Sequence, residues 1–168
     1  MKIEYDKEVD ALYIRIQEKK VYYTRELEEA AVRLHGHGGP FMVVGLRIGL
    51  EALNVLDARG WFDIKCKAEL RWAPPDACVL DGIQVSTGCT LGKHNIEIEE
   101  KQGVSATFTH RGVRVTLRVK PSVLAKIKGN LEEHNQDEEN PENEAETRQL
   151  MDELIAMPAS KLFEIRTN

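Results

Sequence analysis

Two short runs at the N-terminus alternate between polar and apolar side chains. In residues 11–17, Leu12, Ile14 and Ile16 fall on one face and the residues between them fall on the other. Such alternation is typical of strands, and the charged segment 6–10 between the runs suits a turn. We therefore expect an N-terminal β-hairpin within residues 1–23.

The opening pattern MKIEYDKEVDALYIRI resembles a small family of bacterial and archaeal β-rich domains of unknown function. The resemblance covers the first 25–30 residues of the chain. It adds a structural element but implies no function.

The pattern then changes to a helical period. Thr24 is a suitable N-cap residue and Gly36 a suitable stop signal. Between them, apolar side chains recur at spacings of three and four residues, at Leu27, Ala30, Ala31 and Leu34. The sequence predicts a helix with one apolar face.

Residues 41–57 are apolar on almost every side, which predicts a buried helix that begins at Pro40. Gly45 and Gly49 would allow another backbone to approach it closely. The segment is too short, and with Arg47 and Glu51 too polar, to be a membrane span.

Strand patterns dominate the centre of the chain. Residues 64–70 alternate as one half-buried strand, and residues 96–119 contain three further alternating runs separated by glycine turns. We expect these three runs to form three consecutive antiparallel strands. Short helices are expected at 76–85 and 121–128. The predicted fold class is α+β, with an antiparallel sheet packed against helices in a core domain over residues 24–128.

The C-terminal part differs in composition. Residues 130–148 hold eight of the 28 acidic residues and a single arginine, a sum of −7, so with a net charge of −5 the rest of the chain sums to +2. We expect an acidic linker at 129–143 and a C-terminal helical extension at 144–168. The apolar stripe of that extension, at Leu150, Met151, Leu154 and Ile155, has to dock within the chain or on a partner, which favours a homodimer.

Charge, hydropathy and cysteine content indicate the compartment and the kinds of partner to expect. The charged N-terminus and the lack of a long apolar segment predict a cytoplasmic protein without membrane association. The near-neutral body predicts no nucleic-acid surface. In a reducing compartment, the three cysteines are better explained as core residues, ligands or nucleophiles than as disulfides.

Candidate chemistry is concentrated between residues 78 and 95. Cys89 lies between two glycines and close to Lys93, an arrangement that would favour a thiolate able to act as nucleophile or metal ligand. Cys78 and Asp81 are three residues apart on a predicted helix, so they share a face. The alternative for Cys89 is an inert cysteine buried at a turn.

A second cluster surrounds His35 and His37. Neutral imidazole is a common metal ligand, and two imidazoles from one turn need further ligands from elsewhere. Cys78, Cys89, Asp81 and His94 are the candidates. The sequence therefore predicts that the two clusters meet around one site, although two helix-end histidines bound to water or carbonyl groups would show the same spacing.

The motifs HGHGGPFMVVGLRIG and CVLDGIQVSTGCTLGKHN, in this order, resemble the FmdE family of formylmethanofuran dehydrogenase subunits from about residue 27 to residue 120. The resemblance implies an α+β core, zinc or another divalent transition metal as cofactor, and a link to methanogenesis. It implies His37, Cys78 and Cys89 as ligands, with His35 and Asp81 as alternates. Gly39 stands where many members have a cysteine, and the C-terminal zinc finger of some members is absent.

Three functions are compatible with these features. The first is a metal-binding protein, with Cys89, Lys93 and Asp81 as candidate catalytic groups if the metal activates a bound molecule. The second is a non-catalytic accessory or cofactor-handling subunit of a molybdenum or tungsten oxidoreductase. The third is a metal-free cysteine-dependent enzyme. Three scattered cysteines cannot hold an iron–sulfur cluster of the four-thiolate kind, so the chain would not catalyse formylmethanofuran oxidation alone.

Overall fold

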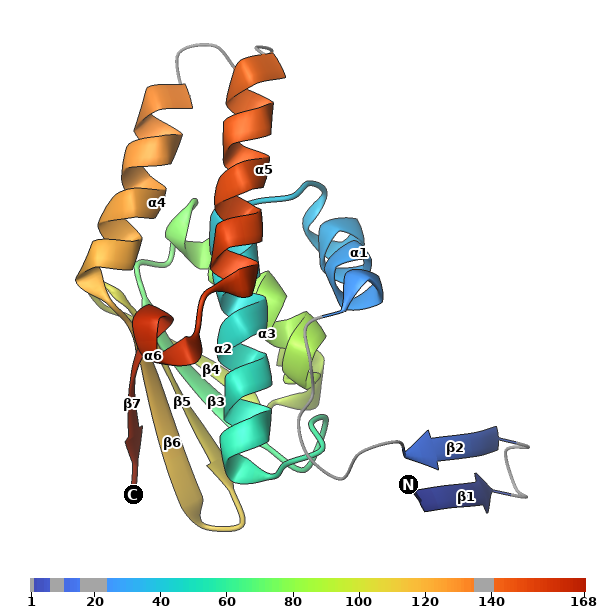
Figure 1. Cartoon of the computed structure of the whole chain (residues 1–168). Coiled ribbons are helices and arrows are strands. Elements are labelled where there is room, and N and C mark those ends of the chain that lie inside the picture. Colours follow the sequence, from blue (N-terminus) through green and yellow to red (C-terminus); the bar gives the residue numbers. More distant parts are fainter. Residues whose placement is uncertain (1, 7–10, 16–23, 135–140) are drawn as a thin grey trace.

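The computed structural model describes residues 2–6, 11–15, 24–134 and 141–168 (Figure 1). The elements in chain order are β1 (Lys2–Asp6), β2 (Ala11–Arg15), α1 (Arg25–His35), α2 (Pro40–Leu56), β3 (Lys65–Leu70), η1 (Asp76–Cys78), α3 (Val79–Thr87), η2 (Leu91–Lys93), β4 (Ile96–Glu100), β5 (Val104–His110), β6 (Val113–Val119), α4 (Pro121–His134), α5 (Pro141–Ala156), α6 (Ala159–Leu162) and β7 (Phe163–Thr167). The predicted α+β class is confirmed.

The first two strands and the first helix follow the sequence prediction. Strands β1 and β2 pair in antiparallel fashion, with Ile3 opposite Ile14. The Thr24 hydroxyl accepts a hydrogen bond from the Leu27 backbone N–H, and Gly36 ends α1 in the left-handed conformation at a φ of 99°. The two helix ends are therefore set by the side-chain cap and the glycine that the sequence shows.

The central sheet has five strands in the order β4-β3-β5-β6-β7. The three strands of residues 96–119 were predicted to lie side by side in chain order. This prediction is wrong for β4, because β3 lies between β4 and β5. Strand β4 runs parallel to β3, with Cys66 opposite Ile96. Parallel neighbours need a crossover connection, and η1, α3 and η2 form it. The sheet is therefore mixed, while the β5–β6 hairpin is as predicted.

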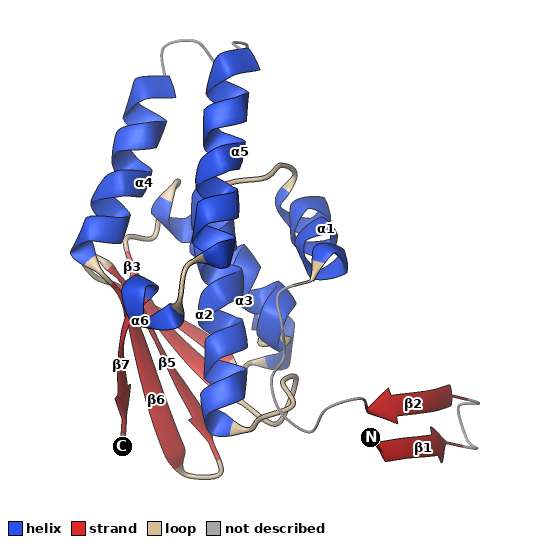
Figure 2. Ribbon diagram, viewed as in Figure 1, coloured by secondary structure: helices blue, strands red, loops and turns tan. Residues whose placement is uncertain are grey.

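Helix α2 runs along one face of the sheet (Figure 2). Its neighbour α3 packs so closely that the backbones touch. A Cβ atom at Gly45 would lie 2.0 Å from the Val79 carbonyl oxygen, and one at Gly49 would lie 1.9 Å from the Ser86 Oγ atom. The close approach predicted from these glycines is confirmed. No described helix is long and apolar enough to cross a lipid bilayer.

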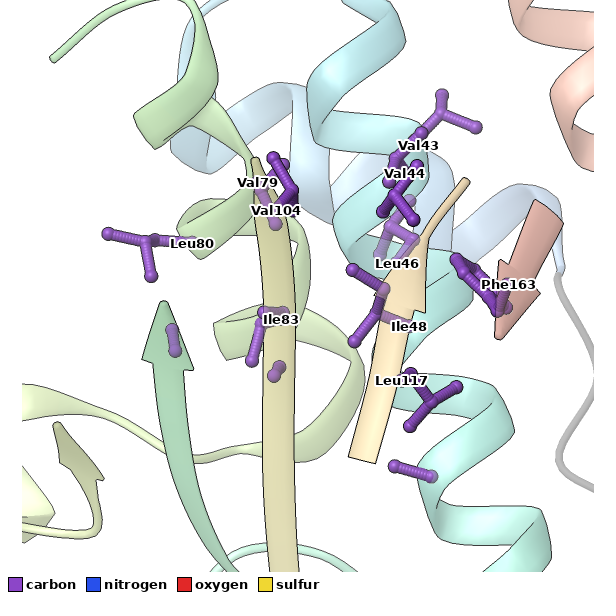
Figure 3. Close-up of a cluster of buried hydrophobic side chains, with 14 of the residues drawn as sticks. Val43, Val44, Leu46, Ile48, Val79, Leu80, Ile83, Val104, Leu117 and Phe163 are labelled. Atoms are coloured by element: carbon purple, nitrogen blue, oxygen red, sulfur yellow. The ribbon is translucent and has the colours of Figure 1, made fainter. Parts of the chain in front are cut away.

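The hydrophobic core fills the space between these helices and the sheet. Figure 3 shows side chains of α2 and α3 gathered with Val104 of β5, Leu117 of β6 and Phe163 at the start of β7. Phe163 comes from the C-terminal segment and is only 2% exposed. The C-terminal segment thus contributes to the same core as the central helices.

The C-terminal segment differs from the predicted linker and helical extension. Helix α4 continues to His134 and α5 begins at Pro141, so much of residues 129–143 is helical, and residues 135–140 lie outside the described residues. After α5 the chain adds β7 to the edge of the sheet. Propensity alone does not reveal this strand, because pairing with β6 creates its environment.

The apolar stripe of α5 docks on the chain's own core. Leu150, Met151 and Leu154 are buried. The Arg47 guanidinium of α2 donates hydrogen bonds to the carbonyl groups at the end of α5, at 2.8 Å to Leu154 and 2.8 Å to Met157, and also to Ile155. The prediction of a homodimer assumes that this stripe is exposed. In the structure, other parts of the same chain cover it.

Candidate functional site

A pocket of about 350 Å³ opens beside the C-terminal end of α1 and the start of α3. The polar lining groups are His35 from α1, Cys78 from the end of η1, and Asp81 and Gln84 from α3. The spacing of three residues places the α3 groups on one helix face. The other walls are largely apolar and are formed by Trp72, Pro74, Ala77, Leu80, Leu91, Ile96 and Ile98. Polar groups from two distant parts of the chain therefore converge on an apolar hollow.

His35 and Asp81 form the centre of the polar side. The His35 Nδ1 atom lies 2.7 Å from the Asp81 Oδ2 atom, and the His35 side chain is only 9% exposed. An ionised carboxylate only accepts hydrogen bonds, so Nδ1 carries the proton when Asp81 is charged. The Gln84 Nε2 atom lies 3.4 Å from Asp81 Oδ1, a longer contact. The second His35 nitrogen, Nε2, is then the ring atom that can accept a proton or bind a ligand.

Cys78 lies at the junction of η1 and α3 and is partly buried. Burial raises the pKa of its thiol, and the negative charge of Asp81 raises it further. A free thiol with a raised pKa is protonated at neutral pH, so it is a poor nucleophile without a nearby cation. A positive charge in the pocket would reverse this tendency.

Cys89 does not line the pocket. Its side chain is fully buried, and the Sγ atom lies 3.6 Å from the Ile64 carbonyl oxygen. Burial raises the pKa of the Cys89 thiol, and this outweighs the lowering by the Thr87 hydrogen bond and by the smaller effect of the Lys93 charge. The structure thus places Cys89 in the core beside β3, where the predicted lowering of its pKa does not occur. The hypothesis of a metal-free thiol enzyme at Cys89 has no support from this environment.

Gly88, beside Cys89, has a structural task that the sequence did not reveal. Gly88 ends α3 with a φ of 70°, and a Cβ atom there would lie 2.7 Å from Cδ1 of Trp61. Asn95 then holds the loop, since its side chain accepts a hydrogen bond from Thr90 N at 2.9 Å and donates one to the Ile64 carbonyl at 3.2 Å. This turn explains Gly88, whereas an added Cβ atom at Gly92 would meet nothing within 4 Å.

The remaining predicted groups lie outside the pocket lining. His37 is exposed, with its ring centroid 4.6 Å from that of His35. The Lys93 ammonium donates to Thr90 Oγ1 at 3.3 Å. His94 is exposed and has a φ of 54°. Of the two predicted clusters, the structure therefore brings together His35, Cys78 and Asp81, but not Cys89 or Lys93.

A zinc site needs three or four donors around one point. Within the described part of the chain, no group of three or more His, Cys, Asp and Glu side chains is arranged to hold a metal ion. His35, Cys78 and Asp81 are the pocket side chains of zinc-ligand type, and the Asp81 carboxylate is already hydrogen-bonded to His35. His35 and Cys78 could therefore hold a metal ion only if other donors supplied the remaining ligands.

The walls of the pocket were missed by reasoning from the sequence. Trp72 and Leu91 are 59% and 61% exposed, although both line the pocket. Ile96 and Ile98 project from β4, which the sequence placed beside β5. The alternation of Ile96 and Ile98 was the available signal, but it does not show which helix the strand faces.

The fold and the pocket define an α+β protein with a mixed sheet and a His–Asp pair at the edge of an apolar hollow. The sequence profile of the FmdE family, described as "Molybdenum formylmethanofuran dehydrogenase operon", matches residues 34–164. The chain therefore belongs to the FmdE family, as its two motifs predicted. A family described as a protein of unknown function (DUF2283) matches residues 2–34.

Known structures support the same fold. The chain is similar to a tungsten formylmethanofuran dehydrogenase FmdE-like protein from Syntrophus aciditrophicus, with a TM-score of 0.59 and 16% sequence identity. The similarity covers 85% of this chain and 70% of that protein. No curated protein sequence matches the chain.

Proposed function

We propose that this FmdE-family chain is an accessory protein that binds a small molecule in the pocket at His35, alongside a molybdenum or tungsten oxidoreductase. The observation that carries the proposal is the convergence of His35, Cys78, Asp81 and Gln84 on one side of an apolar hollow. A few polar groups within a largely apolar pocket are typical of ligand sites. The family's description and the name of the structurally similar protein supply the kind of partner enzyme.

The polar groups would orient the bound molecule and exchange a proton with it. Asp81 fixes the His35 ring through the 2.7 Å hydrogen bond, so that Nε2 can accept a hydrogen bond or a proton. Asp81 would stabilise the imidazolium that results. The protonated Cys78 thiol offers a weak donor beside this pair. This chemistry suits binding and proton transfer better than attack by a thiolate.

Zinc is a second candidate, and one observation favours it. A carboxylate bound to one nitrogen of an imidazole is the arrangement that orients many metal-binding histidines, and Cys78 lines the same pocket. His35 Nε2 and Cys78 Sγ would hold the ion, with other donors from water or the bound molecule. Such an ion supplies Lewis-acid activation of a bound oxygen. Because the Cys78 pKa is raised, zinc would bind more tightly as the pH increases.

Fragment screening by NMR on the full chain tests the proposal. We expect ligands to shift the amide signals of residues 78–84 and of β4. His35→Ala should weaken binding by about 10-fold to 100-fold, because one hydrogen bond to the ligand is lost. Lys93→Ala is the matched control and should leave binding unchanged, since Lys93 lies outside the pocket lining.

A different pattern of shifts would contradict the proposal. If ligands leave residues 78–84 unchanged and shift residues 92–94, and if Lys93→Ala weakens binding, the binding site is the glycine-rich loop and not this pocket. A titration with Zn²⁺ in the same setting decides the second candidate, since zinc should shift the signals of His35 and Cys78 and lose its effect in Cys78→Ser. The full chain is required because α5, α6 and β7 belong to the core.

A further inference from the structure

We propose that the ligand of this pocket is an organic cation, a protonated amine carried on a compact apolar body. The inference rests on the proposed function and adds the chemical class of the ligand. It follows from the charges that line the pocket, from the contacts that Asp81 makes, and from the nature of the remaining walls.

The charges lining the pocket favour a cation. Asp81 is the carboxylate among the described lining residues, and no lysine or arginine is found among them. The nearby Arg71 is directed to Asp76, at 3.0 Å, and to the Pro74 carbonyl. An anionic ligand such as a phosphate or a carboxylate would therefore meet a negative group without a fixed positive partner.

The geometry of Asp81 leaves room for an ammonium group. One carboxylate oxygen, Oδ2, is held by His35 at 2.7 Å. The other, Oδ1, has the Gln84 amide at 3.4 Å, beyond the usual length of a strong hydrogen bond. An ammonium group can take the place of the amide at Oδ1 and donate a second hydrogen bond to the Gln84 Oε1 atom.

The other walls select an organic cation over a hydrated metal ion. Ile96 and Ile98 of β4 provide apolar surface, and Trp72 and Leu91 line the pocket while more than half exposed. A metal ion that keeps its hydration shell would not be stabilised by these apolar walls. An apolar ligand would be stabilised, because both its surface and that of the walls are removed from water. The Trp72 indole can also contact a cation or stack on a flat ring.

Three ligands with the same phenyl body test the inference at pH 7: phenethylammonium, 2-phenylethanol and phenylacetate. Binding is followed by Trp72 fluorescence in a Trp61→Phe background, which leaves one tryptophan in the chain. We expect phenethylammonium to bind at least about 10-fold more tightly than the alcohol, because it adds an ion pair with Asp81. Phenylacetate should bind more weakly than the alcohol. Asp81→Asn should abolish the preference for the amine over the alcohol.

Equal affinities for the three ligands, or an order that favours phenylacetate, would overturn the inference while leaving the pocket as a binding site. The same holds if none of the three changes Trp72 fluorescence but fragments still shift residues 78–84. The order measured on the chain with Asp81 intact decides the matter even if Asp81→Asn does not fold. The proposed function fails separately, when no ligand of any class shifts the pocket residues.

Discussion

Replacing Gly82 by alanine should lower the free energy of unfolding by at least about 3 kcal/mol. A Cβ atom at this position would lie 2.1 Å from the Met42 carbonyl oxygen and 2.5 Å from the Leu46 backbone nitrogen. Both atoms belong to the backbone of α2, so no side chain can rotate away. Helices α2 and α3 would have to separate, which loosens the pocket side of α3 as well as the core. Urea unfolding followed by circular dichroism measures the effect.

The matched control is Gly129→Ala in α4, where an added Cβ atom meets nothing within 4 Å. Alanine is the better helix former by about 1 kcal/mol, so this variant should be as stable as the parent or more stable by up to that amount. The two substitutions are chemically identical and are expected to act in opposite directions. A Gly82→Ala protein that is more stable than the parent would show that α2 and α3 do not make this contact.

The second large effect is expected at the C-terminus. Phe163 is 2% exposed and belongs to the central core. Phe163→Ala should lower the free energy of unfolding by about 3–5 kcal/mol, through lost burial and the cavity that remains. Thermal unfolding of the variant checks this value. The reason is that β7 completes the sheet of its own chain, with Phe163 opposite Val119 of β6.

Ile165 provides the control on the same strand. It is 37% exposed, and Ile165→Ala should cost about 1 kcal/mol or less. If both variants have equally small effects, the C-terminal segment does not dock on its own chain in solution. The apolar stripe of α5 would then be available to a partner, which is one of the two possibilities that the sequence leaves open.

Local signals in the sequence were sufficient for the first half of the fold. Thr24 and Gly36 bound α1 through interactions made within a few residues, so the sequence can show them. The apolar character of 41–57 predicted the buried helix α2, and Gly45 and Gly49 predicted its close contact. Each of these features depends on neighbours in the chain or on a helix period.

The order of the strands could not be read in this way. Alternation shows that residues 96–100 form a strand with two different faces, but it does not show which strand lies beside it. The connection through α3 places β4 parallel to β3, whereas a hairpin would have placed it next to β5. Strand β7 was missed for a similar reason, since pairing with β6 is a contact between residues about fifty positions apart.

The candidate site was predicted in part. The helix spacing placed Cys78 and Asp81 on one face, and the structure brings His35 to them, as expected from the predicted meeting of the two clusters. Cys89 was predicted to belong to the site because it lies beside glycines, but glycines beside a cysteine are typical of a tight turn as well as of a reactive loop. The structure shows the turn, with Gly88 at a positive φ against Trp61 and Cys89 turned into the core.

The central claim is that the reactive groups face the pocket at His35 and that Cys89 belongs to the core. Alkylation of the native protein with iodoacetamide, followed by peptide mass spectrometry, tests this most directly. Cys78 should be modified first, at a rate that still rises above pH 9 because its pKa is raised, while Cys66 and Cys89 should react only in denaturant. Rapid modification of Cys89 in the native protein, at or before Cys78, would contradict the account.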